Sequence, residues 1–333
     1  MKKRTEEKMK IAIFYGKPTE GSGKDEQDTL VQAETVAEIL HRSGHTPVSI
    51  PLSFNLQEAI EAFAHHAPDL VFNLVESVAT HGRLIHVAPS LLDALQLPYT
   101  GAGTNAMFLT SNKLLAKQQL ACAGLPTPAW FSAKSLQNNP VVTQNRYILK
   151  SVWEHASIGL SEAATLETNS AAELRDFLFT HSTQHRGESF FEAYIEGREL
   201  NLSVLAGKHG VEVLPPAEIS FDTYPVGKLR IVDYRAKWEE ESFEYQNTPR
   251  RFTFPPEDDD LLENLKTFAQ RCWDLFELRG YARVDFRVDQ DNRPWILEIN
   301  ANPCLSPDAG FMAAAAQAGL TMPQVIERIL NDV

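Results

Sequence analysis

Two strand-like runs near the C-terminus constrain the fold more than any other feature of the chain. The runs ARVDFRVD (282–289) and RPWILEIN (293–300) alternate polar and apolar residues and flank a short polar segment. Asp291 and Asn292 suit the two central positions of a tight hairpin turn, because both residues tolerate a positive φ. The pattern therefore predicts an antiparallel hairpin with one apolar face, which belongs to a core, and one polar face.

The predicted register opposes two carboxylates across this hairpin. It pairs Arg283 with Asn300, Asp285 with Glu298 and Arg287 with Ile296 on the polar face, and it sets Val284, Phe286 and Val288 against Ile299, Leu297 and Trp295 on the apolar face. Paired Cβ atoms lie roughly 5 Å apart, so the two acids repel unless a cation offsets their charge. Mg²⁺ binds oxygen ligands of this kind, whereas the two arginines would neutralise the acids on an ordinary solvated face. The residues alone leave both alternatives open.

The N-terminal third alternates strands with helices, which predicts a small parallel α/β unit. Strands are expected at 11–15, near 48 and at 70–75, and amphipathic helices at 28–42 and 56–65. A turn-rich stretch, 97–103, marks the first boundary. Thr110 or Ser111 is then expected to cap a helix that carries Lys113 and Lys117 and ends at Gly124.

The rest of the chain combines strands with a long irregular segment. Strands are expected at 147–150, 190–195, 199–206 and 211–221, helices at 171–180, 261–278, 311–318 and 323–331, and the hairpin at 282–301. Residues 222–259 are interpreted as an excursion, and such loops are usually functional or disordered. With a length of 333 residues, the pattern predicts three domains, 1–100, 101–188 and 189–333.

The charge and the cysteines exclude several classes of function. The net charge of −13 argues against general binding to nucleic acids or to anionic membranes, which relies on clustered lysine and arginine. No stretch approaches the length of a membrane span. Cys122, Cys272 and Cys304 form no CxxC pair, so neither a zinc site nor a disulfide framework is indicated. A reducing cytoplasm fits this composition best.

A series of motifs resembles the ATP-grasp superfamily, and specifically its D-alanine:D-alanine ligase branch. The motifs LPYTGAG, SNKLLAKQQLACAGLPTP, YILK, EAYIEGREL, DYRAKW, ARVDF and LEINANP follow the family's order and cover nearly the whole chain. The resemblance implies an ATP-grasp fold of the α/β class, with α+β subdomains and an N-terminal parallel α/β domain. It also implies an ATP-dependent ligase that activates a carboxylate as an acyl phosphate, which an amine then attacks to form an amide.

By this resemblance, the polar face of the hairpin would hold ATP. Asp285, Glu298 and Asn300 would bind two Mg²⁺ ions, with Mn²⁺ as an alternative, and Arg283 would stabilise the charge on the transferred phosphoryl group. Lys113, Lys150 and Lys237 match the lysines around the phosphates; Glu192, Tyr194 and Ile195 match the adenine contacts, and Glu199 the ribose-binding acid. Ser157, in a loop (154–159) that matches the lid over the phosphates, and Glu76 complete the candidate catalytic residues.

Without the resemblance, simpler interpretations of several residues apply. Lys113 would be a solvated helix residue, and Tyr194 and Ile195 would be ordinary core residues of a strand. Glu76 and Asp308 would be surface acids, which is the usual environment of an isolated carboxylate.

The amino-acid pockets depart from the family pattern. Glu76 stands where D-alanine ligases carry a histidine, and Trp238 where they carry a tyrosine. Ala156 and Ala309 replace serines that hold the acceptor and the terminal carboxylate. Because a site discriminates strongly through the hydrogen bonds it makes to its ligand, we expect a product other than D-Ala-D-Ala. Glu76 and Asp308 are candidates to receive an amino group or a more basic substrate.

The sequence therefore predicts a cytoplasmic carboxylate–amine ligase for small amino-acid-like substrates, without nucleic-acid or membrane partners. A homodimer is left open. One alternative is a ligase that modifies a protein or peptide terminus. Another is a catalytically degenerate ATP-binding scaffold, against which the complete set of Arg283, Asp285, Glu298 and Asn300 argues.

Overall fold

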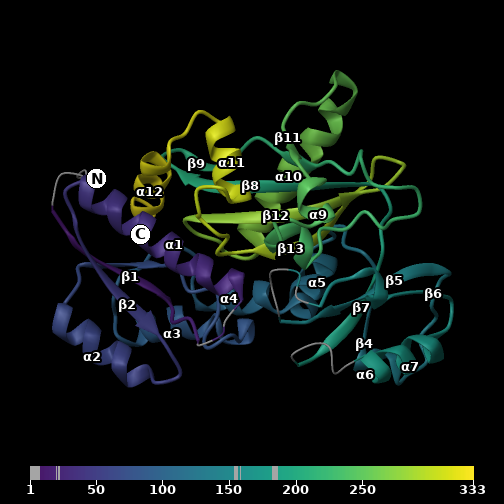
Figure 1. Cartoon of the computed structure of the whole chain (residues 1–333), viewed down its shortest axis with the longest axis horizontal. Helices are drawn as coiled ribbons and strands as arrows, with labels where there is room; N and C mark the ends of the chain where they lie inside the picture. The colour runs from purple at the N-terminus through teal and green to yellow at the C-terminus, as the bar shows by residue number, and fades with distance from the viewer. Residues whose placement is uncertain (1–7, 20, 22, 154–156, 158, 182–186) are drawn as a thin grey trace.

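Three sheets organise the chain in the computed structural model (Figure 1). The structure describes residues 8–19, 21, 23–153, 157, 159–181 and 187–333. Among the helices of these ranges, none combines the length and the hydropathy that a membrane span requires.

The N-terminal sheet is parallel, as predicted. Its order is β2 (Thr46–Leu52), β1 (Lys10–Gly16) and β3 (Leu70–Asn73), and its helices are α1 (Lys24–Arg42), α2 (Leu56–His66), η2 (Gly82–Leu84) and α3 (Val87–Ala94). Successive residues of a strand point to opposite faces, so Ala12 and Phe14 pack with α2 and α3. Ile11 and Ile13 instead share a core with α1 and with the C-terminal helices α11 (Gly310–Gln317) and α12 (Met322–Leu330). This shared core joins the two ends of the chain.

A four-stranded antiparallel sheet occupies the middle of the chain. Its order is β4 (Trp130–Ser132), β7 (Ser189–Ala193), β5 (Asn145–Ser151) and β6 (Thr165–Thr168), and α6 (Ala133–Leu136), η3 (Glu162–Ala164) and α7 (Ala171–His181) accompany it. Tyr147, Leu149 and Phe191 pack against these helices. Since β7 pairs with both β4 and β5, we propose that the central domain extends to Ala193, beyond the predicted boundary at 188.

The third sheet is antiparallel and contains the predicted hairpin. Its order is β11 (Arg250–Arg251), β10 (Ala217–Ile219), β8 (Arg198–Gly207), β12 (Tyr281–Val288) and β13 (Pro294–Asn300), and β9 (Gly210–Val213) also pairs with β8. The helices α4 (Thr104–Ser111), α5 (Lys113–Cys122) and α10 (Asp259–Leu275) cover the apolar face of this sheet. The excursion 222–259 is ordered and forms α8 (Tyr234–Trp238), α9 (Phe243–Gln246), β11 and η5 (Pro256–Asp258).

Two local predictions were wrong. Thr110 and Ser111 belong to α4, and the cap of α5 is Asn112, whose side chain accepts hydrogen bonds from the N–H groups of residues 114 and 115. Asn112 competes well for this position because its side-chain oxygen reaches the first free N–H groups of the helix. The single strand expected at 211–221 is split into β9 and β10.

The hairpin register agrees with the prediction only in the half that is remote from the turn. Asp285 pairs with Glu298, and Arg283 with Asn300, but Arg287 pairs with Trp295 and not with Ile296. The turn explains part of the difference. Asn292 adopts a φ of 57° and Asp291 has no positive φ, and the N–H of residue 289 donates to the carbonyl of residue 293 at 3.0 Å. These features make a three-residue loop in place of the predicted two-residue turn.

A β-bulge at Leu297 restores the predicted register beyond the turn and changes which residues face the core. The register shifts between Asp285 and Phe286, so Leu297 has no partner on β12. Ile296 and Ile299 are buried in the core at 0% and 1% exposure, while Leu297 and Glu298 both line a pocket on the other face. The prediction that Leu297 and Trp295 lie on the core side was therefore wrong.

Candidate functional site

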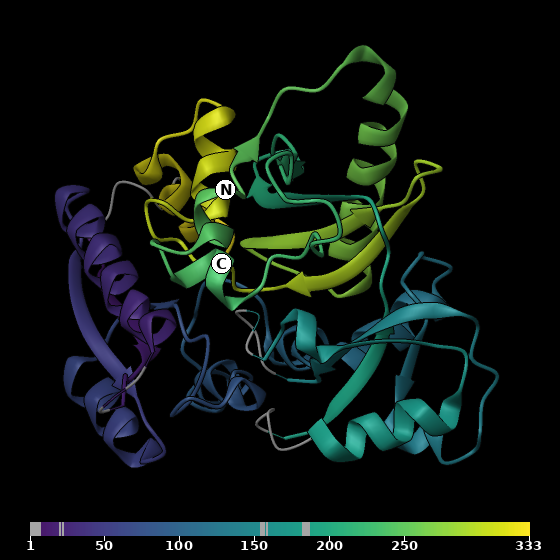
Figure 2. The ribbon, with the colours of Figure 1, turned by 45° about the vertical axis from the view of Figure 1, so that its right-hand side comes forward.

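One pocket collects most of the predicted nucleotide residues between the four-stranded sheet and the hairpin sheet. Its lining includes Lys113, Lys150, Ser157, Glu192, Tyr194, Ile195, Glu199, Lys237, Asp285 and Glu298. Figure 2 shows the four-stranded sheet below the hairpin sheet. Lys150 and Glu192 come from β5 and β7, and Asp285 and Glu298 come from the hairpin. Residues from distant parts of the sequence thus meet in one place.

The two opposed carboxylates have different cationic partners. Arg283 donates two hydrogen bonds to Asp285, at 2.7 and 2.8 Å, and Asn201 Nδ2 donates a third at 2.9 Å. Glu298 Oε2 lies 3.7 Å from Nζ of Lys113. Burial alone would lower the pKa of Arg283, but Asp285 and then Glu298 raise it above its ordinary value, so the guanidinium stays charged.

The donor set suits Mg²⁺ only in company with further oxygen ligands. Asp285, Glu298 and Asn300 offer two carboxylates and one amide, and the side-chain oxygen of Asn300 also accepts the N–H of residue 302 at 3.0 Å. Within the described ranges, no group of three or more His, Cys, Asp or Glu side chains converges on one point. Mg²⁺ commonly binds to one or two carboxylates and takes its other ligands from phosphates and water, so these residues fit a metal that arrives with a nucleotide.

Arg287 holds the segment between β7 and β8 in place and does not neutralise the opposed acids. Its guanidinium, 4% exposed, donates to the carbonyls of residues 195, 197 and 230 at 2.8–3.1 Å. It also lies 3.2 Å from Glu199 Oε2 and 3.3 Å from the hydroxyl of Tyr194. Burial raises the pKa of Glu199 even though Arg287 opposes the shift. Arg287 therefore fixes two of the predicted nucleotide contacts, Tyr194 and Glu199.

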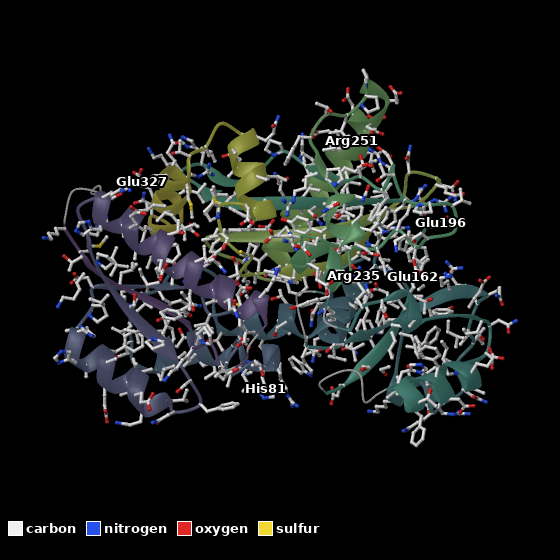
Figure 3. All side chains as sticks on the ribbon, viewed as in Figure 1. His81, Glu162, Glu196, Arg235, Arg251 and Glu327 are labelled. Atoms are coloured by element: carbon white, nitrogen blue, oxygen red, sulfur yellow. The ribbon has the colours of Figure 1, made fainter. Side chains whose placement is uncertain are left out.

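The excursion forms one wall of the pocket. Its residues Ile231 and Lys237 line the pocket, and the N–H of Leu229 donates to Glu162 Oε1 at 3.1 Å. Figure 3 labels Glu162 and also Arg235, which belongs to the excursion. The hydroxyl of Ser157, at a φ of 61°, donates to the carbonyl of Val232 at 2.8 Å. Burial and the neighbouring Arg283 lower the pKa of Lys237. An anion in the pocket would favour the charged form of this lysine.

A second polar cluster lies where α1 meets the segment after β13. Asp28 accepts hydrogen bonds from Ser306 Oγ at 2.7 Å and from the thiol of Cys304 at 2.9 Å. Gln32 donates to Glu76 at 2.8 Å. Burial and the nearby Glu76 and Asp28 raise the pKa of Cys304, so the thiol is protonated and a poor nucleophile. Glu76 is therefore no isolated surface acid, although it does not line the nucleotide pocket.

The residues at which the amino-acid pockets depart from the family pattern lie in different environments, and some lie outside the described residues. Residues 154–156, with the alanine that replaces a family serine, lie outside the described residues. Ala309 is the N-cap of α11 and accepts no helix N–H with its side chain. Asp308 is exposed, and its carbonyl accepts a hydrogen bond of 3.2 Å from Arg250. Trp238 has a buried indole N–H without a partner in the described part of the chain.

The sequence analysis assigned no role in the site to two polar residues, Asn201 and Lys117, although their spacing from predicted site residues places them on the same faces. Asn201 follows Glu199 by two residues on a predicted strand, which places both side chains on one face. Lys117 follows Lys113 by four residues on a predicted helix, which places both on one side of that helix. Lys117 is 1% exposed and contacts Glu192.

Comparisons with known proteins bear on the family and the fold of the chain. A family model described as D-ala D-ala ligase C-terminus matches residues 120–331. A D-alanine–D-alanine ligase of Moorella thermoacetica is 30% identical over 97% of this chain and 98% of that protein. An uncharacterised protein of Sinorhizobium fredii is 28% identical over 90% of this chain and 86% of that protein. A solved D-alanine–D-alanine ligase of Bacillus anthracis, complexed with ATP, has a TM-score of 0.71 at 18% identity and covers 97% of both chains.

Removal of Arg287 leaves the carboxylate of Glu199, whose side chain is 13% exposed, without its close ion-pair partner. We expect Arg287→Met to lower the free energy of unfolding by about 3–5 kcal/mol at neutral pH. A carboxyl whose pKa is raised in the folded state favours folding when it is protonated, so this loss shrinks as the pH falls. Urea unfolding at pH 8 and pH 5 measures the difference. The matched control is the double variant Arg287→Met, Glu199→Gln. For it we expect a smaller loss of unfolding free energy, and one that does not depend on pH. An equal loss for Arg287→Met at both pH values would contradict the assignment.

Proposed function

Since the chain belongs to the D-alanine–D-alanine ligase family of ATP-dependent ligases, which form carbon–nitrogen bonds on an ATP-grasp fold, we propose that it joins two small amino-acid-like substrates through an acyl phosphate. The observation that carries the proposal is the polar face of the hairpin. That face sets Asp285 and Glu298 side by side in a pocket that also contains Lys113, Lys150 and Lys237. The pocket thus offers carboxylates for a metal and cations for phosphates.

The nucleotide would lie between the two sheets. Tyr194, Ile195 and Glu199 all line the pocket, and Arg287 contacts both Tyr194 and Glu199, a grouping that suits an adenine ring and a ribose. The lysines would face the phosphates, in a chain whose net charge of −13 otherwise repels anions. Mg²⁺, when bound at Asp285, Glu298 and Asn300, would neutralise part of the phosphate charge.

The chemistry consists of two displacements. In the first, an oxygen of the substrate carboxylate bonds to the γ-phosphorus of ATP, and the bond from that phosphorus to ADP breaks. In the second, the amine nitrogen bonds to the activated carbonyl carbon, inorganic phosphate leaves with the bonding electrons, and the nitrogen loses a proton. Arg283, held in place by Asp285, would stabilise the negative charge that develops in both steps.

The substrate pocket would lie beside the second polar cluster. Glu76 and Asp28 place negative charge there, which favours a substrate with an amino group. Ala309 offers no hydroxyl for a terminal carboxylate. A family member that relies on such a hydroxyl would discriminate through it, so we propose a product other than D-Ala-D-Ala.

The metal assignment is tested by Glu298→Gln. We expect this variant to lower ATP-dependent phosphate release by about 10²–10³-fold, the usual loss when one preorganised electrostatic contact to the transition state is removed. The measurement is phosphate release with Mg-ATP over a screen of paired carboxylic and amino acids. Glu212→Gln is the matched control, because Glu212 pairs with Arg328 and does not line the pocket. Turnover that Glu298→Gln leaves intact would refute the assignment.

The same screen tests the substrate proposal. We expect D-alanine alone to give much less phosphate release than the best acid and amine pair, and Ala309→Ser to increase the D-alanine reaction. Efficient D-alanine dimerisation by the unmodified protein would overturn this expectation. Turnover with peptide amines alone would favour a ligase for peptide termini, and ATP binding without any turnover would favour a scaffold.

A further inference from the structure

The carboxylate of Glu192 is shared by two lysines. Nζ of Lys117 lies 2.5 Å from one oxygen, and Lys150 binds the other oxygen as a close ion pair. Glu192 is only 3% exposed. Burial alone would raise the pKa of Glu192, but the two lysines hold it below its usual value. Both oxygens of Glu192, which lines the pocket, are therefore paired with a lysine.

The two lysines differ in how firmly they are held. Lys117 is 1% exposed, donates to the hydroxyl of Thr127 at 2.8 Å, and lies 5.9 Å from the centre of the Trp130 ring. The hydroxyl of Thr127 in turn donates to the carbonyl of Ile296 at 2.8 Å, which connects Lys117 to the hairpin. Lys117 is thus a fixed cation whose displacement would break several contacts.

Lys150 makes fewer polar contacts than Lys117. Its side chain is 19% exposed and lines the pocket, and its only hydrogen bond or ion pair with a described residue is to Glu192. It lies on β5, on the face of the four-stranded sheet opposite to the packed helices. A lysine has a long flexible stem and a compact charge, so Lys150 can move along the pocket while Lys117 stays.

We propose that Lys150 exchanges partners when the nucleotide binds. Its ammonium group moves from Glu192 to the phosphates, and one oxygen of Glu192 becomes available to the amino group of adenine. The inference rests on the proposed function, because it requires ATP in this pocket. A polyphosphate carries several negative charges and outcompetes one carboxylate for the lysine. Glu192 does not become an unpaired buried charge on this exchange, because Lys117 remains beside it.

The exchange couples recognition of the base to recognition of the phosphates. Adenosine, which has no phosphate, cannot attract Lys150 and must compete with an ion pair for the same oxygen. ADP and ATP bring the anion that releases Glu192. Lys150 therefore makes the protein selective for phosphorylated nucleotides through a penalty on the free nucleoside, in addition to any direct phosphate contact.

The test compares adenosine and ADP binding by isothermal titration calorimetry in the full chain. We expect Lys150→Met to bind adenosine about fivefold more tightly or better, and ADP about fivefold more weakly or worse, magnitudes typical of coupled sites. Lys113→Met is the matched control. Lys113 pairs with Glu298, whereas the two oxygens of Glu192 pair with Lys117 and Lys150, so we expect its loss to weaken ADP binding without improving adenosine binding. Thermal melting confirms folding, and Lys150→Gln replaces Lys150→Met if the latter does not fold.

The outcomes separate this inference from the proposed function. Adenosine affinity that is unchanged or weaker in a folded Lys150 variant, while the unmodified protein binds ADP, overturns the exchange alone. An equal gain of adenosine affinity in Lys113→Met also overturns it, because the gain would then reflect general loss of positive charge. No ADP binding by the unmodified protein overturns both the exchange and the proposed nucleotide site.

Discussion

The opposition of Asp285 and Glu298 across one hairpin is the constraint on which the rest of the site depends. Two carboxylates at this spacing repel, and the structure supplies a cation on each side, Arg283 at Asp285 and Lys113 at Glu298. The hairpin can be folded before a ligand binds because these partners offset the repulsion. Lys113 Nζ lies 3.7 Å from Glu298 Oε2, and both residues line the pocket, so under the proposed function the nucleotide and its metal would bind beside this pair.

The bulge at Leu297 decides how the same hairpin serves both the core and the pocket. Strict alternation would place Leu297 in the core and Ile296 in the pocket, but the extra residue reverses their places. Glu298 and Leu297 then stand together on the pocket side, so an apolar surface lies next to the acid. Bulges often occur beside active sites, where they redirect a side chain.

The sequence predicted the fold, and it named most of the residues that line the pocket, from local patterns and from the order of the motifs. Alternation in β12 indicated which face of the hairpin belongs to the core, and the order of the motifs indicated the ATP-grasp arrangement. The bulge at Leu297 could not be predicted from the sequence, because no residue type is specific for a β-bulge. The sequence also could not show that Arg287 pairs with Glu199 and not with Asp285 or Glu298, since this pairing depends on β8 lying beside β12.

Transfer of oxygen from the acid substrate to phosphate tests the central claim most directly. The acid of the most active substrate pair is labelled with oxygen-18 in its carboxylate, and the released phosphate is examined by phosphorus NMR. An acyl phosphate leaves one labelled oxygen in each inorganic phosphate, because the carbon–oxygen bond breaks when the amine attacks. Phosphate released without label would mean that ATP is hydrolysed apart from the carboxylate, and that the hairpin does not promote the proposed reaction.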